Sequence, residues 1–258
     1  MSTVDARYDF RERRATAVLT AVPWAICNGL QLGFTLVHTA FWIAIALVVR
    51  LITGGPRLPL RMAARVWAPG LLGGAGARLS LEGAGAIDWS KPYVLVANHA
   101  SVIDVCALFR AVPVPLRFVL KAEMARVPFL GRYARAMGML FVDRRGRDAG
   151  AHLVDGGAAL LRRGAVLCVF PEGTRSRDGR IAAFKGGAFQ TAIEAGVDVL
   201  PVAIVGAGDV LPAGGLFRVR PGRIAVRFGT PLPAAGRDRA SLAREARDAV
   251  IALHGQAS

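Results

Sequence analysis

Hydrophobic positions follow two different patterns along the chain and divide it into two parts. From Ala15 to Val49 the sequence runs for 35 residues without a formal charge and carries few polar side chains, among them His38. As one straight helix this run would be about 50 Å long, whereas a bilayer core needs only about 20 apolar residues. The pattern therefore predicts either one long tilted helix or two shorter helices, broken near Pro23 or within Asn28–Gly33.

Basic residues flank this apolar run on both sides. Arginines precede it from Arg7 to Arg14 and follow it from Arg50 to Arg65, so the positive-inside rule gives no orientation for a single span. We therefore expect both ends on the cytoplasmic face of a membrane, with the helix dipping into one leaflet and returning through Leu58–Leu72. A true membrane span and a buried helix of a soluble protein are the alternatives.

The second part of the chain follows a glycine-rich stretch, Gly70–Gly85, which is typical of a linker or turn region. Short apolar runs then alternate with helical patterns, which predicts an α/β domain with a mixed sheet flanked by helices. We expect a membrane-associated helical segment over residues 1–75 and the α/β domain over residues 76–258. The expected strands are Tyr93–Ala97, Arg117–Leu120, Met139–Val142, Val166–Phe170, Val199–Val205 and Ile224–Phe228. The expected helices are Asp104–Ala111, Phe129–Met137, Gly150–Arg163, Ala188–Ala195 and Ala240–His254.

Composition and charge narrow the possible functions. The 258 residues are 53% hydrophobic and 20% charged, which excludes a disordered or low-complexity chain. The three cysteines lie far apart without a CxxC pair, so neither a zinc module nor a disulfide framework is expected. The net charge of +15 favours an anionic partner such as lipid headgroups or an acidic carrier protein. Nucleic acid is not expected, since aromatic residues for base stacking make up only 7% of the chain.

The basic residues are unusual in kind as well as in number. All but three of the 33 are arginines, a bias that a GC-rich genome also produces without any function. The charge therefore indicates a class of partner and does not identify one.

The first candidate site follows the strand expected at Tyr93–Ala97. His99 comes two residues after this strand and Asp104 five residues later, and open α/β sheets place their sites at the carboxyl ends of strands. We expect His99 in the turn and Asp104 in the first helical turn, where a bend brings the carboxylate to the imidazole. Such a pair suits a general base. In the alternative, Asn98 and Asp104 cap the helix and His99 is a turn residue; Ser101 lacks the elbow motif of a nucleophile.

Two further segments with candidate chemistry also follow apolar strands. The segment Phe170–Ser176 reads FPEGTRS, and FKGG follows at the start of an expected helix. Glycines let backbone N–H groups approach an anion, and Arg175 and Lys185 supply positive charge, which is typical of a phosphate site. The alternative is a polar turn in which Glu172 pairs with Arg175. The segment Gly138–Arg147 ends with three arginines, a charge run that by itself indicates a solvated loop.

These segments together resemble a known enzyme family. Four blocks match the glycerolipid acyltransferases in order and spacing: Asn98-His99 with Asp104, the Arg144 segment, Phe170–Arg175 and the proline-containing strand Val199–Ile204. The resemblance covers roughly residues 77–232 and is strongest to the bacterial 1-acyl-sn-glycerol-3-phosphate (lysophosphatidic acid) acyltransferases. The last block departs from the family pattern, because Asp198 stands where a proline is common before Pro201.

The resemblance implies transfer of a fatty acyl group from acyl-CoA or acyl carrier protein to the free hydroxyl of 1-acyl-sn-glycerol 3-phosphate, giving phosphatidic acid in phospholipid biosynthesis at a membrane. It implies that His99 deprotonates this hydroxyl, that Asp104 orients His99, and that no cofactor, metal or acyl-enzyme is needed. Backbone N–H groups near Gly173 or Gly186 are candidate oxyanion donors. The implied acceptor site consists of Lys121, Arg144, Glu172, Gly173, Thr174, Arg175 and Lys185.

Two other interpretations stay open. A related transferase could use another lyso-lipid, such as a lyso-ornithine lipid, in which case the arginines would serve the carrier instead of an acceptor phosphate. A non-enzymatic basic membrane-binding protein would explain the charge and the apolar run. It would not explain why His99 and Asp104 accompany a phosphate site.

Overall fold

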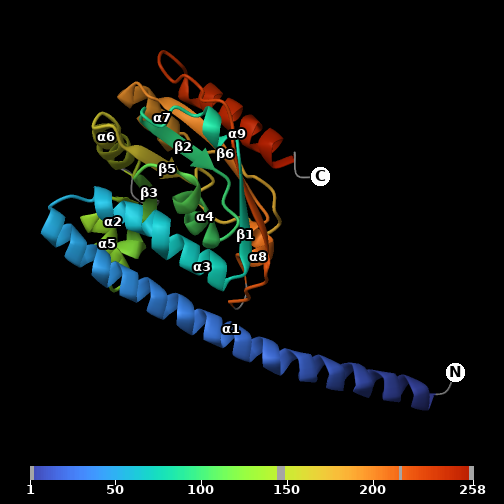
Figure 1. The fold of residues 1–258 in the computed structure, drawn as a ribbon. Coiled ribbons are helices and arrows are strands. Elements are labelled where there is room, and N and C mark those ends of the chain that lie inside the picture. The colour runs from blue at the N-terminus through green and yellow to red at the C-terminus, as the bar shows by residue number, and fades with distance from the viewer. Residues whose placement is uncertain (1–2, 144–148, 215–216, 256–258) are drawn as a thin grey trace.

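The computed structural model describes residues 3–143, 149–214 and 217–255. One seven-stranded sheet in the order β1-β7-β6-β2-β5-β3-β4 carries helices on both faces (Figure 1). Neighbouring strands are parallel except β6 and β7, which are antiparallel. The expected mixed α/β sheet is confirmed. The strands are β1 (Ala77–Glu82), β2 (Tyr93–Ala97), β3 (Leu116–Lys121), β4 (Leu140–Val142), β5 (Val166–Val169), β6 (Asp198–Val205) and β7 (Gly222–Phe228).

The six expected strands are all present, and their ends differ from the expected ends by two residues at most. They were predictable because helices cover the sheet on both sides. A strand buried on both faces reads as a continuous apolar run instead of an alternating one. Every residue of β2 and of β5 is buried.

The five expected helices are confirmed as well, and several short helices accompany them. The helices after β1 are η2 (Ala84–Ala86), α4 (Ile103–Ala111), η3 (Ala122–Arg126), α5 (Leu130–Ala136), α6 (Ala149–Leu161), α7 (Gly187–Ala195), α8 (Ala207–Val210) and α9 (Arg239–Gly255). Helices α6, α7 and α9 lie on the face of the sheet opposite to α4 and the N-terminal helices (Figure 1). The sheet therefore has a core on each side.

Alternate residues of β2 enter these two cores. Leu95 and Ala97 belong to the core that includes α4, whereas Val94 and Val96 belong to the core that includes α7 and α9. This alternation follows from the two-residue period of a strand. It fixes the register of β2 at the centre of the sheet, and with it the position of the turn that follows at His99.

The N-terminal part forms a helical hairpin. Helix α1 (Thr3–Thr53) is continuous, so the helix has no break near Pro23 or within Asn28–Gly33. After a turn at Gly54, the chain returns through α2 (Arg57–Met62), the π-helical turn η1 (Ala63–Trp67) and α3 (Ala68–Gly74). The expected return segment is therefore confirmed, although the structure contains no membrane. The indole N–H of Trp67 donates to Thr39 Oγ1 at 3.2 Å, which ties the two arms of the hairpin together.

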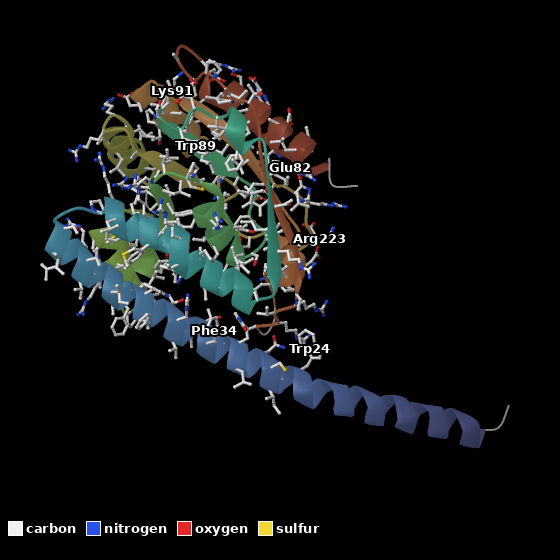
Figure 2. All side chains as sticks on the ribbon, in the orientation of Figure 1. Trp24, Phe34, Glu82, Trp89, Lys91 and Arg223 are labelled. Carbon is white, nitrogen blue, oxygen red and sulfur yellow. The ribbon has the colours of Figure 1, made fainter. Side chains whose placement is uncertain are left out.

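Most of the apolar surface of α1 between Trp24 and Thr53 is not covered by protein. An 18-residue window within this stretch has a mean hydropathy of 2.1, and only 11% of that window is buried. Leu30 and Val37 are both 70% exposed, whereas Trp24 and Phe34 lie on the side of the helix that faces the rest of the molecule (Figure 2). Apolar patches of this extent mark interaction surfaces, so α1 is a possible membrane anchor.

The interpretation of Gly70–Gly85 as a linker is wrong. This stretch contains the end of α3 and the whole of β1, which pairs in parallel with β7 at one edge of the sheet. The strand is short and mostly exposed, and glycines with positive φ precede and follow it at Gly76 and Gly83. Because the strand has no continuous apolar run and lies between glycines, the sequence pattern indicates a turn region instead of a strand. The expected division of the chain at residue 75 stays a prediction.

Candidate active site

The candidate residues lie at one edge of the sheet because the strands that precede them are adjacent and parallel. Strands β2, β5, β3 and β4 are neighbours in this order. Their carboxyl ends lead into His99, the Phe170–Ser176 segment, Lys121 and the Arg144 segment. This is the edge at which open α/β sheets bind ligands. Arg144 itself lies outside the described residues.

His99 and Asp104 form the expected pair. The Nδ1 atom of His99 lies 2.8 Å from Asp104 Oδ2, and the two side chains are 18% and 0% exposed, respectively. The same oxygen accepts the backbone N–H groups of Ala100 at 2.9 Å and Ser101 at 2.8 Å. With Nδ1 turned to the carboxylate, Nε2 is left as the ring nitrogen that can accept a proton.

Of the two residues in the alternative, Asn98 does not cap the helix, whereas Asp104 in the first turn of α4 binds the backbone of the turn before it. Helix α4 begins after Val102, and no side chain caps it. Asn98 instead extends the pairing of β2 with β6: its Nδ2 donates to the Ile204 carbonyl at 2.9 Å, and its Oδ1 accepts the Ile204 N–H at 2.8 Å.

Ser101, Cys106 and Cys168 are not candidate nucleophiles. Ser101 is fully buried, and its hydroxyl donates to the carbonyl of Leu211 at 2.6 Å. Burial raises the pKa of the Cys106 thiol to about 12 and that of Cys168 well above its usual value. Both thiols therefore stay protonated and unreactive near neutral pH.

Glu172 joins the second candidate segment to the first. It is 5% exposed, its Oε1 accepts the backbone N–H of His99 at 2.8 Å, and its Oε2 accepts the N–H of Ala182 at 3.0 Å. Burial raises the pKa of this carboxyl. The N–H of Ser176 also donates to the His99 carbonyl at 2.7 Å. The expected alternative pairing of Glu172 with Arg175 is therefore not formed.

The remaining candidate residues are less closely connected. An added Cβ at Gly173, where φ is +75°, would come within 2.8 Å of Lys185 Nζ, so Gly173 and Lys185 lie together. The Gly173 N–H donates to the Phe170 carbonyl at 3.1 Å and is not free for an oxyanion. Thr174 and Arg175 are exposed, and Arg175 has no ion-pair partner within the described chain. Lys121 Nζ lies 2.7 Å from Glu123 Oε1.

A cleft of about 180 Å³ opens beside His99 and contains residues that the sequence did not indicate. One wall includes His99, Glu172 and Ser176, and the other is formed by residues 206–209 and by His254 of α9. Burial, together with the nearby Arg227, lowers the pKa of His254. This histidine is 155 positions away from His99 in the sequence, and no motif marks it.

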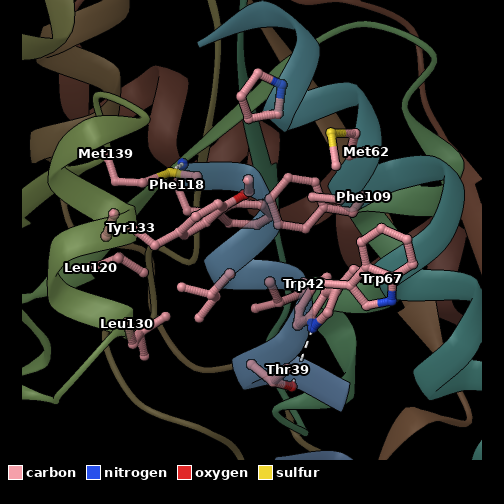
Figure 3. A pocket seen from close by; sticks show the side chains of 16 residues that line it. Thr39, Trp42, Met62, Trp67, Phe109, Phe118, Leu120, Leu130, Tyr133 and Met139 are labelled. Atoms are coloured by element: carbon pink, nitrogen blue, oxygen red, sulfur yellow. Dashed lines mark hydrogen bonds between the residues drawn. The ribbon is translucent and has the colours of Figure 1, made fainter. Parts of the chain in front are cut away.

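On its other side, His99 is connected by aromatic rings to an apolar cavity. The His99 ring stacks on Phe170 with centroids 4.0 Å apart, and Phe170 lies 6.2 Å from Phe118. Phe118 and Phe109 line a cavity of about 90 Å³ enclosed by α1, α2, α4, β3 and α5 (Figure 3). Its lining is almost wholly apolar, with Tyr133 and Thr39 among the few polar residues. No sequence pattern indicates this cavity.

Comparisons with known proteins agree with this geometry. The model of the family described as Acyltransferase matches residues 78–205. A 1-acyl-sn-glycerol-3-phosphate acyltransferase of Chlamydomonas reinhardtii is 36% identical over 143 residues, which are 55% of this chain and 43% of that protein. A lyso-ornithine lipid O-acyltransferase of Pseudomonas aeruginosa is 37% identical over 184 residues, covering 65% of this chain and 70% of that protein.

The fold is also that of a solved structure. The crystal structure of PlsC, the 1-acyl-sn-glycerophosphate (LPA) acyltransferase from Thermotoga maritima, matches with a TM-score of 0.76 at 23% identity, covering 92% of this chain and 98% of that one. This likeness includes the helical hairpin, since it extends over nearly the whole chain. The matched segment begins within β1 and ends with β6, and thus contains His99, Asp104, Glu172 and Arg175. The chain belongs to the acyltransferase family.

Proposed function

We propose that this protein transfers a fatty acyl group from a thioester, acyl-CoA or acyl carrier protein, to the free hydroxyl of a lyso-lipid. The observation that carries this proposal is the His99–Asp104 pair at 2.8 Å, with Asp104 fully buried and His99 open to a cleft. A fixed imidazole with one free nitrogen is the group that an alcohol acceptor needs as a general base.

The proposed reaction is direct. The hydroxyl oxygen bonds to the thioester carbonyl carbon while its proton passes to His99 Nε2. The C–S bond then breaks, and the leaving thiolate takes the proton from Nε2. Asp104 holds the ring in the correct tautomer and stabilises the imidazolium that forms in between.

The acceptor that we propose is 1-acyl-sn-glycerol 3-phosphate. Lys185 and Arg175 lie in the segment that is bonded to the His99 loop through Glu172 and Ser176, and free cations there suit a phosphate. Lyso-ornithine lipid is the second candidate acceptor, because the relative from Pseudomonas aeruginosa, 70% of whose length is matched, is a lyso-ornithine lipid O-acyltransferase. Arg144, Lys121 and Thr174 stay predicted members of the acceptor site.

The apolar features of the chain suit substrates that carry acyl chains. The apolar cavity lined by Phe118 lies beyond Phe170, whose ring stacks on His99. The exposed apolar residues of α1 would bury themselves in a bilayer, and the hairpin keeps both ends of the apolar run on one side. We therefore place the protein on the cytoplasmic face of a bacterial inner membrane.

Purified protein supplied with lysophosphatidic acid and an acyl thioester is expected to release free thiol and to form phosphatidic acid. His99→Ala removes the proton acceptor and should lower kcat by roughly 100-fold or more with little change in acceptor KM. Thiol release and thermal unfolding of the same samples are the measurements. Wild-type turnover in a folded His99→Ala variant, or no turnover of wild type with any lyso-lipid, would contradict the proposal.

Arg175→Ala tests the nature of the acceptor. Losing a charge-assisted contact of about 1.5 to 3 kcal/mol should raise the KM for lysophosphatidic acid by about 10- to 150-fold and leave the KM for lyso-ornithine lipid unchanged. Arg177→Ala removes an exposed arginine from the same segment and serves as the control. If Arg175→Ala has no effect on the phosphate-bearing acceptor, the phosphate site lies elsewhere.

Glu172→Gln tests whether this residue positions His99 or binds the acceptor. A glutamine can accept only one of the two backbone N–H groups, so the His99 loop should loosen and kcat should fall by roughly 10-fold or more at constant acceptor KM. Glu194→Gln, an exposed carboxylate that pairs with Arg162, should behave as wild type. A rise in acceptor KM at constant kcat would instead make Glu172 an acceptor ligand.

Membrane attachment should survive a wash with 1 M salt (about 3 Å Debye length), because buried apolar area does not depend on screened charge. Leu30→Glu with Val37→Glu changes two exposed positions on α1 and should move protein into the soluble fraction. Leu81→Glu, at an exposed position on the edge strand β1, is the control and should stay bound. Release of wild-type protein by salt alone would refute the apolar anchor.

A further inference from the structure

A second cavity lies on the opposite face of the sheet from α1 and the apolar cavity. It is a groove of about 880 Å³ between α6, the start of α7 and the N-terminal half of α9, at the top of the view in Figure 1. Its size is that of a site for a small organic ligand rather than for an ion. Phe184, Gly186 and Gly187 of the FKGG segment line it, whereas His99, Asp104 and Glu172 do not.

The groove is lined by an excess of positive charge. Three arginines of α9, Arg239, Arg244 and Arg247, line it together with one carboxylate, Asp155. Arg239 and Arg244 are exposed and have no ion-pair or hydrogen-bond partner in the described part of the chain. The stem of Arg239 lies against Gly186, where an added Cβ would be 3.5 Å from Arg239 Cδ. Two guanidinium groups are thus available for an anion.

One wall of the groove is hydrogen-bonded to the loop that contains Glu172. Arg247 donates to the carbonyls of Ile181 at 2.7 Å and Ala182 at 2.9 Å. The N–H of Ala182 in turn donates to Glu172, whose other oxygen holds the N–H of His99. The backbone N–H of Lys185 also donates to the Pro171 carbonyl at 3.0 Å. The groove and the His99 cleft therefore share the loop over residues 171–187.

We propose that this groove binds the nucleotide phosphates of the acyl donor, acyl-CoA, so that its thioester arm extends toward His99. This inference rests on the proposed function. Guanidinium groups bind phosphate oxygens in pairs, and Phe184, Val154 and Ala243 give the groove apolar area against which a nucleobase packs. A concave groove favours this small ligand over a carrier protein, which needs a broad contact surface.

The proposal also separates the two substrates in space. The lyso-lipid approaches from the apolar side formed by α1 and the hairpin, and the water-soluble donor approaches from the arginine side formed by α6, α7 and α9. His99 follows the carboxyl end of β2, the central strand of the sheet between these two faces. Each substrate therefore reaches the base without crossing the surface that binds the other.

The test is a double variant, Arg239→Gln with Arg244→Gln, in the full chain. Coenzyme A without an acyl group is titrated by calorimetry, and KM is measured separately for acyl-CoA, acyl carrier protein and lyso-lipid. We expect coenzyme A affinity to fall about 10-fold or more, acyl-CoA KM to rise by a similar factor, and kcat and lyso-lipid KM to stay unchanged. The salt dependence of coenzyme A binding should also weaken.

Arg223→Gln is the matched control. It removes the same charge from an exposed position on β7, near the far edge of the sheet (Figure 2), and should leave coenzyme A affinity at the wild-type value. Unchanged coenzyme A affinity in the double variant, an equal loss in the control, or a loss confined to acyl carrier protein would each overturn the proposal. If the double variant loses coenzyme A binding but the wild-type protein shows no transferase activity, the groove proposal is supported and the proposed function is refuted.

Discussion

The buried carboxylate of Asp104 is the group on which the geometry of the candidate site depends. An ionised carboxylate inside a protein is stable only when donors surround it. Here Oδ2 accepts three N–H groups, from the His99 ring and from the backbone of Ala100 and Ser101, whereas Oδ1 is buried with no partner among the described residues. The turn between β2 and α4 must therefore close around this oxygen, and closing it directs the imidazole toward the cleft. The hydrogen bonds that fold this turn therefore also orient the His99 ring.

The loop of the second segment holds this turn from the other side. The peptide groups of His99 are bonded both to Glu172 and to Ser176, so neither its N–H nor its C=O is left to water. Both segments leave the sheet from neighbouring strands, β2 and β5, which are entirely buried. The two central strands thus hold the His99 turn and the Glu172 loop in place, although these are about 70 residues apart in sequence. The bond from the His99 N–H to Glu172 then holds the His99 backbone in position.

Sequence patterns could predict those parts of the molecule whose cause is local. The central strands and the pairing of His99 with Asp104 follow from apolar runs and from a spacing of five residues. The edge strand β1 escaped prediction because it is exposed and flanked by glycines. The contact between Glu172 and the His99 turn could not be predicted, because the partners of Glu172 are backbone N–H groups and one of them is 73 residues away in the sequence. His254 and the apolar cavity depend on packing between distant helices, which no local pattern records.

The high positive charge also has a different meaning once the structure is known. Several arginines bond to the last carbonyls of helices, where the helix dipole favours a cation. Arg117 and Arg50 bond to the end of α5, Arg162 to the end of α7 and Arg227 to the end of α9. These side chains stabilise the fold and need no ligand. Arg239 lies in the first turn of α9, where the helix dipole disfavours a cation, and Arg244 lies in the next turn. In the described part of the chain neither side chain bonds to a helix end, so neither has the structural role of the other four arginines, and the proposed anion site rests on this difference.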